Sequence, residues 1–172
     1  MKDNLIMNAD MAHRFGQSLH QLGHAVLELQ KLSYTLAPEP LEQLGLDGAM
    51  EELCRQYSEP GLQTISYQPA GIAAELITNA VSIAIYRITE ALLSTTNRPV
   101  SIKKISTGID PVRQSVNLTL TDVRSNFDIT YASGVQKDLW LYVNHYIIYM
   151  NGSIRFQPAD DDGTEIRISF PA

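Results

Sequence analysis

The sequence predicts an α+β fold, a two-layer sandwich in which helices cover one face of a mixed sheet. Three observations support it. Apolar residues repeat at helical spacing through the first half of the chain, the period changes to two after Pro99, and one more helical segment separates two pairs of strands. We expect a long N-terminal helix over residues 1–38 and a compact domain over residues 39–172.

The first helix is expected from Met11 to Leu36, because its apolar residues recur every three or four positions, as on a coiled-coil seam. Pro38 and Pro40 should end it. A second helix is expected from Leu41 to Ser58. Its core-facing residues should be Leu44, Leu46, Met50, Leu53 and Tyr57.

A short strand is expected over residues 64–68, and an almost wholly apolar helix over residues 72–95, buried on several sides. Alternating residues then predict two antiparallel strands, over residues 100–106 and 115–121, with a turn at residues 108–111.

Residues 136–150 are rich in aromatic side chains, which also suit a strand. We interpret them as a helix, because five of their apolar residues share a helical face and Asn151-Gly152 supplies a C-cap. Residues 153–157 and 164–170 should form a closing hairpin across the acidic turn at residues 160–163.

Composition excludes several classes of protein. Of the 172 residues 44% are hydrophobic, enough for a core, and the net charge of −6 argues against nucleic-acid binding. No apolar run approaches the roughly 20 residues that span a membrane, and no secretory signal is recognisable. The single cysteine, Cys54, rules out an internal disulfide and suits the cytoplasm; we expect it to be a buried small residue on a helix.

Two stretches carry a resemblance to a known family. Residues 36–50 read LAPEPLEQLGLDGAM, and residues 84–93 read AIYRITEALL. They resemble bacterial sensor histidine kinases of the nitrate-sensor and desaturase-sensor branch, namely their second dimerisation helix followed by the ATP-binding domain. The closing hairpin is also similar. The resemblance implies the sandwich that this family shares with gyrase and mismatch-repair ATPases.

The resemblance also implies where ATP and Mg²⁺ would bind, if the site still works. The surviving contacts would be Glu90, Asp122, Gly163 and Thr164, while Ser94 stands where the family has an asparagine for Mg²⁺. A serine hydroxyl reaches less far and lacks the amide oxygen of asparagine. Glu90 could serve as a general base, or it could form an ion pair with Arg87. Asp122 could instead cap a turn.

The glycines of the family's nucleotide loops are missing. Arg124 and Asn126 replace two of them, and none survives at residues 137–140, where Asp138 and Trp140 should repel or block a triphosphate. We therefore assign no catalytic residue and expect no metal site in such a degenerate domain.

The phosphoacceptor histidine of the family would lie upstream of Met1 in this register. Weak candidates within the chain are His13, His20 and His24, which share one face of the first helix away from its apolar seam. That face could carry a surrogate phosphoacceptor or a metal pair at His20 and His24. It could also be a solvated polar face.

Three functional hypotheses follow. The first is a non-catalytic or weakly nucleotide-binding signalling module, a pseudokinase that dimerises through Met11 to Leu36 and binds a response regulator or a kinase. The second is the ATP-binding domain of an active sensor histidine kinase. The third is a phosphotransfer protein that accepts phosphate on a histidine.

Overall fold

The computed structural model describes residues 9–59, 64–69, 77–94, 102–122, 135–159 and 163–171. The chain divides into two compact units, Met1–Leu36 and Ala37–Ala172. The first unit contains one described helix, α1, which spans Ala9–Thr35 and agrees with the predicted long helix.

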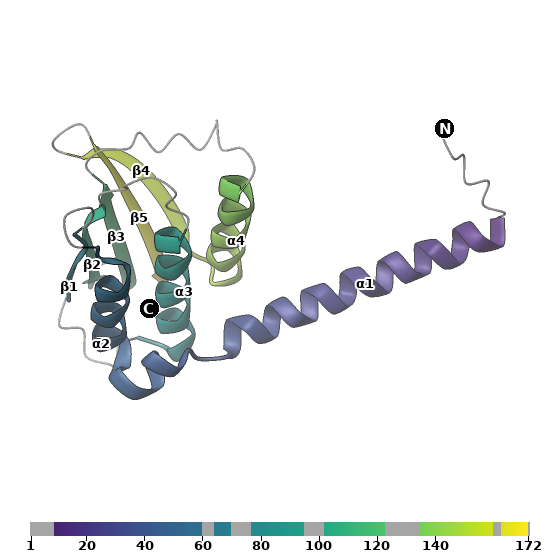
Figure 1. The fold of residues 1–172 in the computed structure, drawn as a ribbon, viewed down its shortest axis with the longest axis horizontal. Coiled ribbons are helices and arrows are strands. Elements are labelled where there is room, and N and C mark those ends of the chain that lie inside the picture. Colours follow the sequence, from purple (N-terminus) through teal and green to yellow (C-terminus); the bar gives the residue numbers. More distant parts are fainter. Residues whose placement is uncertain are drawn as a thin grey trace. The chain divides into compact units, whose positions relative to one another are not determined.

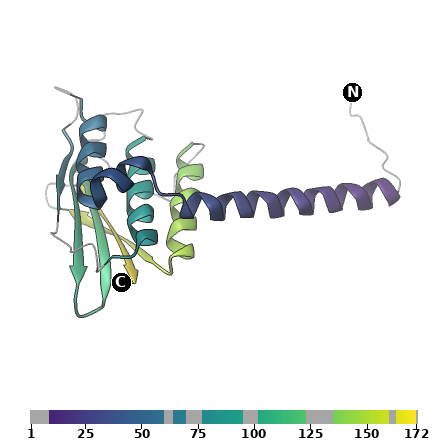
Figure 2. The same cartoon turned by 90° about the horizontal axis from the view of Figure 1, so that it is seen from below.

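In its described residues, the second unit is a five-stranded sheet with three helices on one of its faces (Figures 1 and 2). The strand order is β1-β2-β3-β5-β4, with β1 parallel to β2 and every other pair antiparallel, so the predicted mixed sheet is confirmed. The elements follow in the order α2 (Glu39–Tyr57), β1 (Ser66–Gln68), α3 (Asn79–Ser94), β2 (Ile102–Asp110), β3 (Ser115–Asp122), α4 (Val135–Tyr149), β4 (Ser153–Ala159) and β5 (Gly163–Pro171).

The core lies between the helices and the inner face of the sheet. Helix α3 packs between α2 and α4, and most of its residues from Val81 to Leu93 are buried. Alternate residues of β3 and β5 form the sheet side of this core. These are Val116, Leu118, Leu120, Ile166, Ile168 and Phe170. The period of two predicted for these strands therefore sorts their side chains correctly between an inner and an outer face.

Helix α2 differs in two ways from the prediction. It breaks at Gly45, which has φ 68° and ψ −179°, so the helix changes direction there and Leu44 is 54% exposed instead of facing the core. Pro40 does not end the preceding helix but lies in the first turn of α2, where a missing N–H costs nothing. Met50, Leu53 and Cys54 are buried as expected.

A partly buried chain of hydrogen bonds connects α2 to the sheet. The Tyr67 hydroxyl on β1 donates to Asp47 Oδ1 of α2 at 2.6 Å and lies 2.7 Å from Thr107 Oγ1 of β2. Burial, followed by the bond to Asp47, raises the pKa of Tyr67. The phenol therefore stays protonated and keeps its donor.

Two boundaries also differ from the prediction. Helix α3 begins at Asn79 and does not include residues 77 and 78, because Thr78 caps it: Thr78 Oγ1 accepts from the Val81 N–H at 3.3 Å. Residues 72–76 of the predicted helix lie outside the described residues. Strand β2 continues to Asp110 and so includes the first three residues of the turn predicted at residues 108–111. Asp110 Oδ1 accepts from the Val112 and Arg113 N–H groups, both at 3.0 Å, so the turn begins after it.

The C-cap of α4 forms as predicted. Asn151 takes the left-handed conformation at φ 51°, and the Gly152 N–H donates to the Ile147 carbonyl at 2.7 Å. The glycine is required for a different reason. A Cβ on Gly152 would lie 2.8 Å from Phe170 Cδ1 and 2.9 Å from the Ser169 carbonyl oxygen.

We predict that Gly152→Ala destabilises the second unit by about 1–3 kcal/mol, because the added methyl group meets backbone that cannot move aside. Urea unfolding followed by circular dichroism measures the loss. Gly108→Ala is the matched control, since nothing lies within 4 Å of a Cβ at that strand position. Equal stability of the two variants would contradict the close packing at Gly152.

Candidate functional site

The residues predicted to contact nucleotide lie on three elements of the second unit. Glu90 and Ser94 belong to the C-terminal half of α3, Asp122 ends β3, and Gly163 and Thr164 begin β5. The five positions therefore come from segments that are far apart in the sequence, as the residues of ligand-binding sites often do.

The strand register brings three of them together. Asp122 is paired with Thr164 across β3 and β5, and Gly163 is paired with Ala159 across the β4–β5 hairpin. Directly opposite residues of an antiparallel pair have their Cβ atoms about 4.5–5.5 Å apart. Only the backbone of Asp122 is described, so its alternative role as a turn cap stays a prediction.

Glu90 forms the ion pair that was one of its two interpretations. Arg87 Nη1 donates to Glu90 Oε2 at 3.0 Å, and the two side chains are 30% and 36% exposed. The Arg87 Nε is buried and has no hydrogen-bond partner among the described residues. The carboxylate is therefore held by its own helix and is still reached by solvent.

The phenol groups of two tyrosines interact electrostatically with Glu90. The pKa values of Tyr57 on α2 and Tyr86 on α3 are raised, first by burial and then by the negative charge of Glu90. Both phenols are thus neutral donors near the carboxylate at physiological pH. This side of α3 is the side that faces α2.

Ser94 is the last residue of α3 and is exposed. Its hydroxyl donates to the Ala91 carbonyl oxygen at 2.9 Å, a bond within the helix. The hydroxyl is therefore already committed to backbone, and the position supplies no amide oxygen.

The loop positions where glycines are missing cannot be compared with the structure. Arg124 and Asn126 lie outside the described residues, as do the side chains of Lys137 and Asp138. Trp140 is buried, and its ring meets that of Phe156 on β4 edge-on, with the ring centroids 5.4 Å apart. The ring of Trp140 therefore belongs to the core, and the expectation that it blocks a phosphate stays a prediction.

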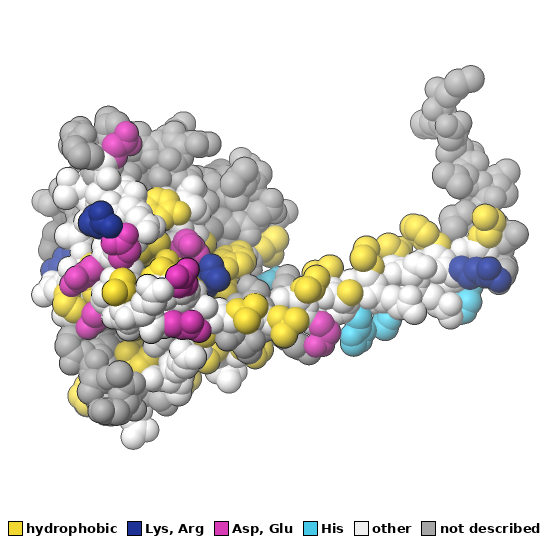
Figure 3. Space-filling model, turned by 60° about the horizontal axis from the view of Figure 1, so that its bottom comes forward, with side chains coloured by type: hydrophobic (Ala, Val, Ile, Leu, Met, Phe, Trp, Pro, Cys, Tyr) yellow, Lys and Arg dark blue, Asp and Glu magenta, His cyan; other side chains and the backbone are white. Residues whose placement is uncertain are grey.

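The histidine candidates are exposed on α1. His13 Nε2 lies 3.0 Å from Gln17 Nε2, and the rings of His20 and His24 lie 5.5 Å apart between centroids. Within the described part of the chain, no group of three or more metal-binding side chains occurs. The row of apolar side chains on α1 runs along a different edge from these histidines (Figure 3).

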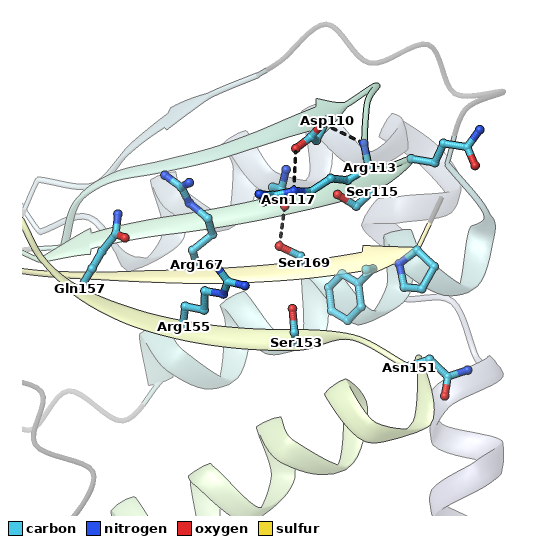
Figure 4. Close-up of a pocket in the computed structure, with 13 residues that line it drawn as sticks. Asp110, Arg113, Ser115, Asn117, Asn151, Ser153, Arg155, Gln157, Arg167 and Ser169 are labelled. Atoms are coloured by element: carbon cyan, nitrogen blue, oxygen red, sulfur yellow. Dashed lines mark hydrogen bonds and ion pairs between the residues drawn. The ribbon is translucent and has the colours of Figure 1, made fainter.

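Sequence reasoning missed a second polar site, on the face of the sheet that the helices leave open. A concavity of about 480 Å³ lies there, which we call the outer-face concavity (Figure 4). Its polar lining residues are Asp110, Arg113, Gln114, Ser115, Asn117, Asn151, Ser153, Arg155, Gln157, Arg167 and Ser169. The alternation of residues along each strand predicts that these side chains point outward. The strand register that brings the arginines together cannot be predicted from the sequence pattern.

Comparison with known proteins agrees with the resemblance found in the sequence. The chain is similar to the sensor histidine kinase MctS of Rhizobium johnstonii, with 27% identity over 120 residues, which cover 69% of this chain and 26% of that protein. The chain thus spans about a quarter of this relative. No protein-family model matches the sequence.

The fold is that of histidine kinases. The structure matches the Acinetobacter baumannii histidine kinase AdeS with a TM-score of 0.53 at 13% identity, covering 96% of this chain and 85% of that one. The blue-light activated histidine kinase of Erythrobacter litoralis EL346 gives a TM-score of 0.48 at 9% identity, over 72% of this chain and 39% of that one. In the described residues, no helix is long and apolar enough to cross a bilayer.

We predict that Glu90→Gln lowers the free energy of unfolding by less than about 1 kcal/mol, because partly exposed ion pairs contribute little. Urea titration provides the measurement. Glu52→Gln is the matched control, since Glu52 pairs with Arg55 at 2.6 Å on α2 in the same i, i+3 arrangement. A loss above about 2 kcal/mol confined to Glu90→Gln would instead assign Glu90 a structural role.

Proposed function

We propose that this chain is a histidine-kinase-like signalling module of a bacterial two-component-type system that acts through dimerisation and partner binding and holds nucleotide weakly or not at all. The observation that carries the proposal is Ser94. Its hydroxyl is bonded to its own helix at the position where the resembling family provides an amide oxygen to Mg²⁺. Mg²⁺ requires near-octahedral oxygen ligands at about 2.0–2.1 Å, so a missing ligand weakens ATP binding directly.

The loss at Ser94 does not stand alone. Arg124 and Asn126 replace glycines that would let the backbone approach a nucleotide, and side chains at such positions occupy that space. Three changes at positions where the resembling family holds nucleotide favour a pseudokinase, because one divergent loop would not explain all of them.

An active kinase domain is the alternative. Two observations favour it: Glu90 is partly exposed and could act as a base, and Asp122 lies opposite Thr164 in the sheet. In that case ATP and Mg²⁺ would be its cofactors, and the phosphoacceptor would be supplied by a histidine helix outside this chain. A phosphotransfer protein is the second alternative, supported by the exposure of His13, His20 and His24.

The dimer that we propose forms through α1. The helix presents a row of apolar side chains with exposures between 47% and 67%, which are Met11, Phe15, Leu19, Leu22, Val26, Leu29, Leu32 and Leu36. Residues at this spacing bury against an identical helix in a two-fold bundle. A response-regulator receiver domain or a kinase would then be the partner, and the unpaired buried Cys54 suits the cytoplasm.

We predict that the chain does not bind a non-hydrolysable ATP analogue with Mg²⁺ more tightly than about 100 μM, which corresponds to about 5.5 kcal/mol. Ser94→Asn alone should not restore binding, because the side chains at the glycine positions remain. Isothermal titration calorimetry on both proteins is the measurement, with Ser94→Ala as the control for changes at the helix end. Binding by the unaltered chain that is lost in Glu90→Ala would support the active-kinase alternative.

We predict that the chain sediments as a dimer and that Leu22→Glu converts it to a monomer, because a carboxylate in the apolar seam must be desolvated on association. Analytical ultracentrifugation across a concentration series gives the dissociation constant. His20→Glu is the matched control, since it adds a carboxylate to the same helix away from the seam. Equal weakening by both variants would argue against the seam as the interface.

A further inference from the structure

The outer face of the sheet is largely polar in its described residues, with apolar exceptions such as Pro171, and differs in charge from the chain as a whole. Outward-pointing polar side chains alternate with buried ones along β3 and β5, and exposed residues alternate with partly buried ones over residues 153–157 of β4. The described charged groups of this face and its adjoining turn are four cations and two anions. They are Lys104, Arg113, Arg155, Arg167, Asp110 and Glu165. A local excess of two positive charges thus sits on a chain of net charge −6.

Two of these arginines are forced into proximity by the register. Arg155 on β4 pairs directly with Arg167 on β5. Like charges at directly opposite positions destabilise an antiparallel pair. The carboxylate of Glu165 compensates the charge of Arg167. Glu165 Oε1 accepts from Arg167 Nη2 at 2.9 Å and from Gln157 Nε2 at 2.6 Å. Arg155 has no ion pair within the described part of the chain, so one guanidinium of the two is uncompensated.

The rest of the outer-face concavity supplies further donors. Arg113 is held only loosely by Asp110, with Nε 3.8 Å from Oδ2. Asn117 Oδ1 accepts from the Ser169 hydroxyl at 2.6 Å, which leaves the Asn117 NH₂ group without a partner among the described residues. Figure 4 shows Asp110, Arg113 and Asn117 close together, with Arg155 and Arg167 further along the same face.

The chemistry of the lining favours a small ligand over a protein partner. Stable protein interfaces have an apolar or aromatic centre, and the apolar lining here consists of Phe170, which is buried, and Pro171 at the strand end. Guanidinium groups bind phosphate and carboxylate through paired N–H donors. A volume of about 480 Å³ accommodates a small molecule.

We propose that the outer-face concavity binds a small polyanion that carries at least two phosphate or carboxylate groups. Arg155 and Arg167 hold one anionic group between them, which removes the repulsion that the register imposes. Arg113 and the Asn117 amide receive the second group. The site lies on the sheet face opposite the helices, so ligand binding there does not depend on nucleotide binding near Glu90. This proposal is therefore independent of the proposed function.

The test is calorimetric titration of the full chain with inorganic pyrophosphate and, separately, with citrate, at low and at physiological salt. We expect saturable binding of one or both probes that weakens as salt screens the charges. Tighter binding of pyrophosphate assigns the natural ligand to phosphate chemistry, and tighter binding of citrate assigns it to carboxylate chemistry. Absence of saturable binding by either probe at low salt overturns the proposal.

Two variants locate the site. Arg155→Gln should weaken binding at least tenfold, and its melting temperature should not fall, because removing one of two opposed cations relieves repulsion. Lys104→Gln is the matched control, since it removes an exposed cation from the same sheet face outside the concavity, and it should change binding less than twofold. An equal loss in both variants would mean that the probes respond only to overall charge, which would overturn the proposal.

Discussion

The structure depends on the burial of α3. This helix exposes little of its surface, because α2 and α4 pack on its two sides and the inner residues of β3 and β5 pack beneath it. Burying a Val, Leu or Ile side chain contributes about 1.5–3 kcal/mol relative to exposure. Helix α3 contributes eight buried apolar residues to the interior, namely Val81, Ile83, Ala84, Ile85, Tyr86, Ile88, Leu92 and Leu93. The helix is held by packing against its neighbours.

This one-sided arrangement has a consequence for the sheet. Because all three helices lie on the same face, alternate residues of each strand are divided between an apolar interior and a surface open to solvent. The inner residues are fixed by packing, while the outer residues can change as long as they remain polar. Substitutions on the outer face can therefore create a binding site without disturbing the core. The presence of Arg155 opposite Arg167 is an example of a residue pair that packing does not explain.

Much of this fold is predictable from local patterns. The helical spacing of α1, the period of two in β3 and β5, and the Asn151-Gly152 cap each depend on a few neighbouring residues, and each is found where expected. The errors come from bonds and conformations that spacing does not reveal. The Thr78 cap delays α3, the Asp110 carboxylate lengthens β2, and the positive φ of Gly45 turns Leu44 toward solvent.

The candidate sites were less predictable, because they depend on pairings between distant segments. The sequence resemblance selected Asp122 and Thr164 separately, and only the register places them opposite each other. The same limit hid the arginines, since no local pattern says that residues 155 and 167 will be neighbours. In both cases the backbone pairing determines which side chains meet, and the chemistry of the site follows from that pairing. The pairing of β3 with β5 sets Asp122 opposite Thr164 whether or not the position of Ser94 supports metal binding. Retention of the strand geometry is therefore weak evidence for catalysis, and the ligand-facing side chains carry the stronger evidence.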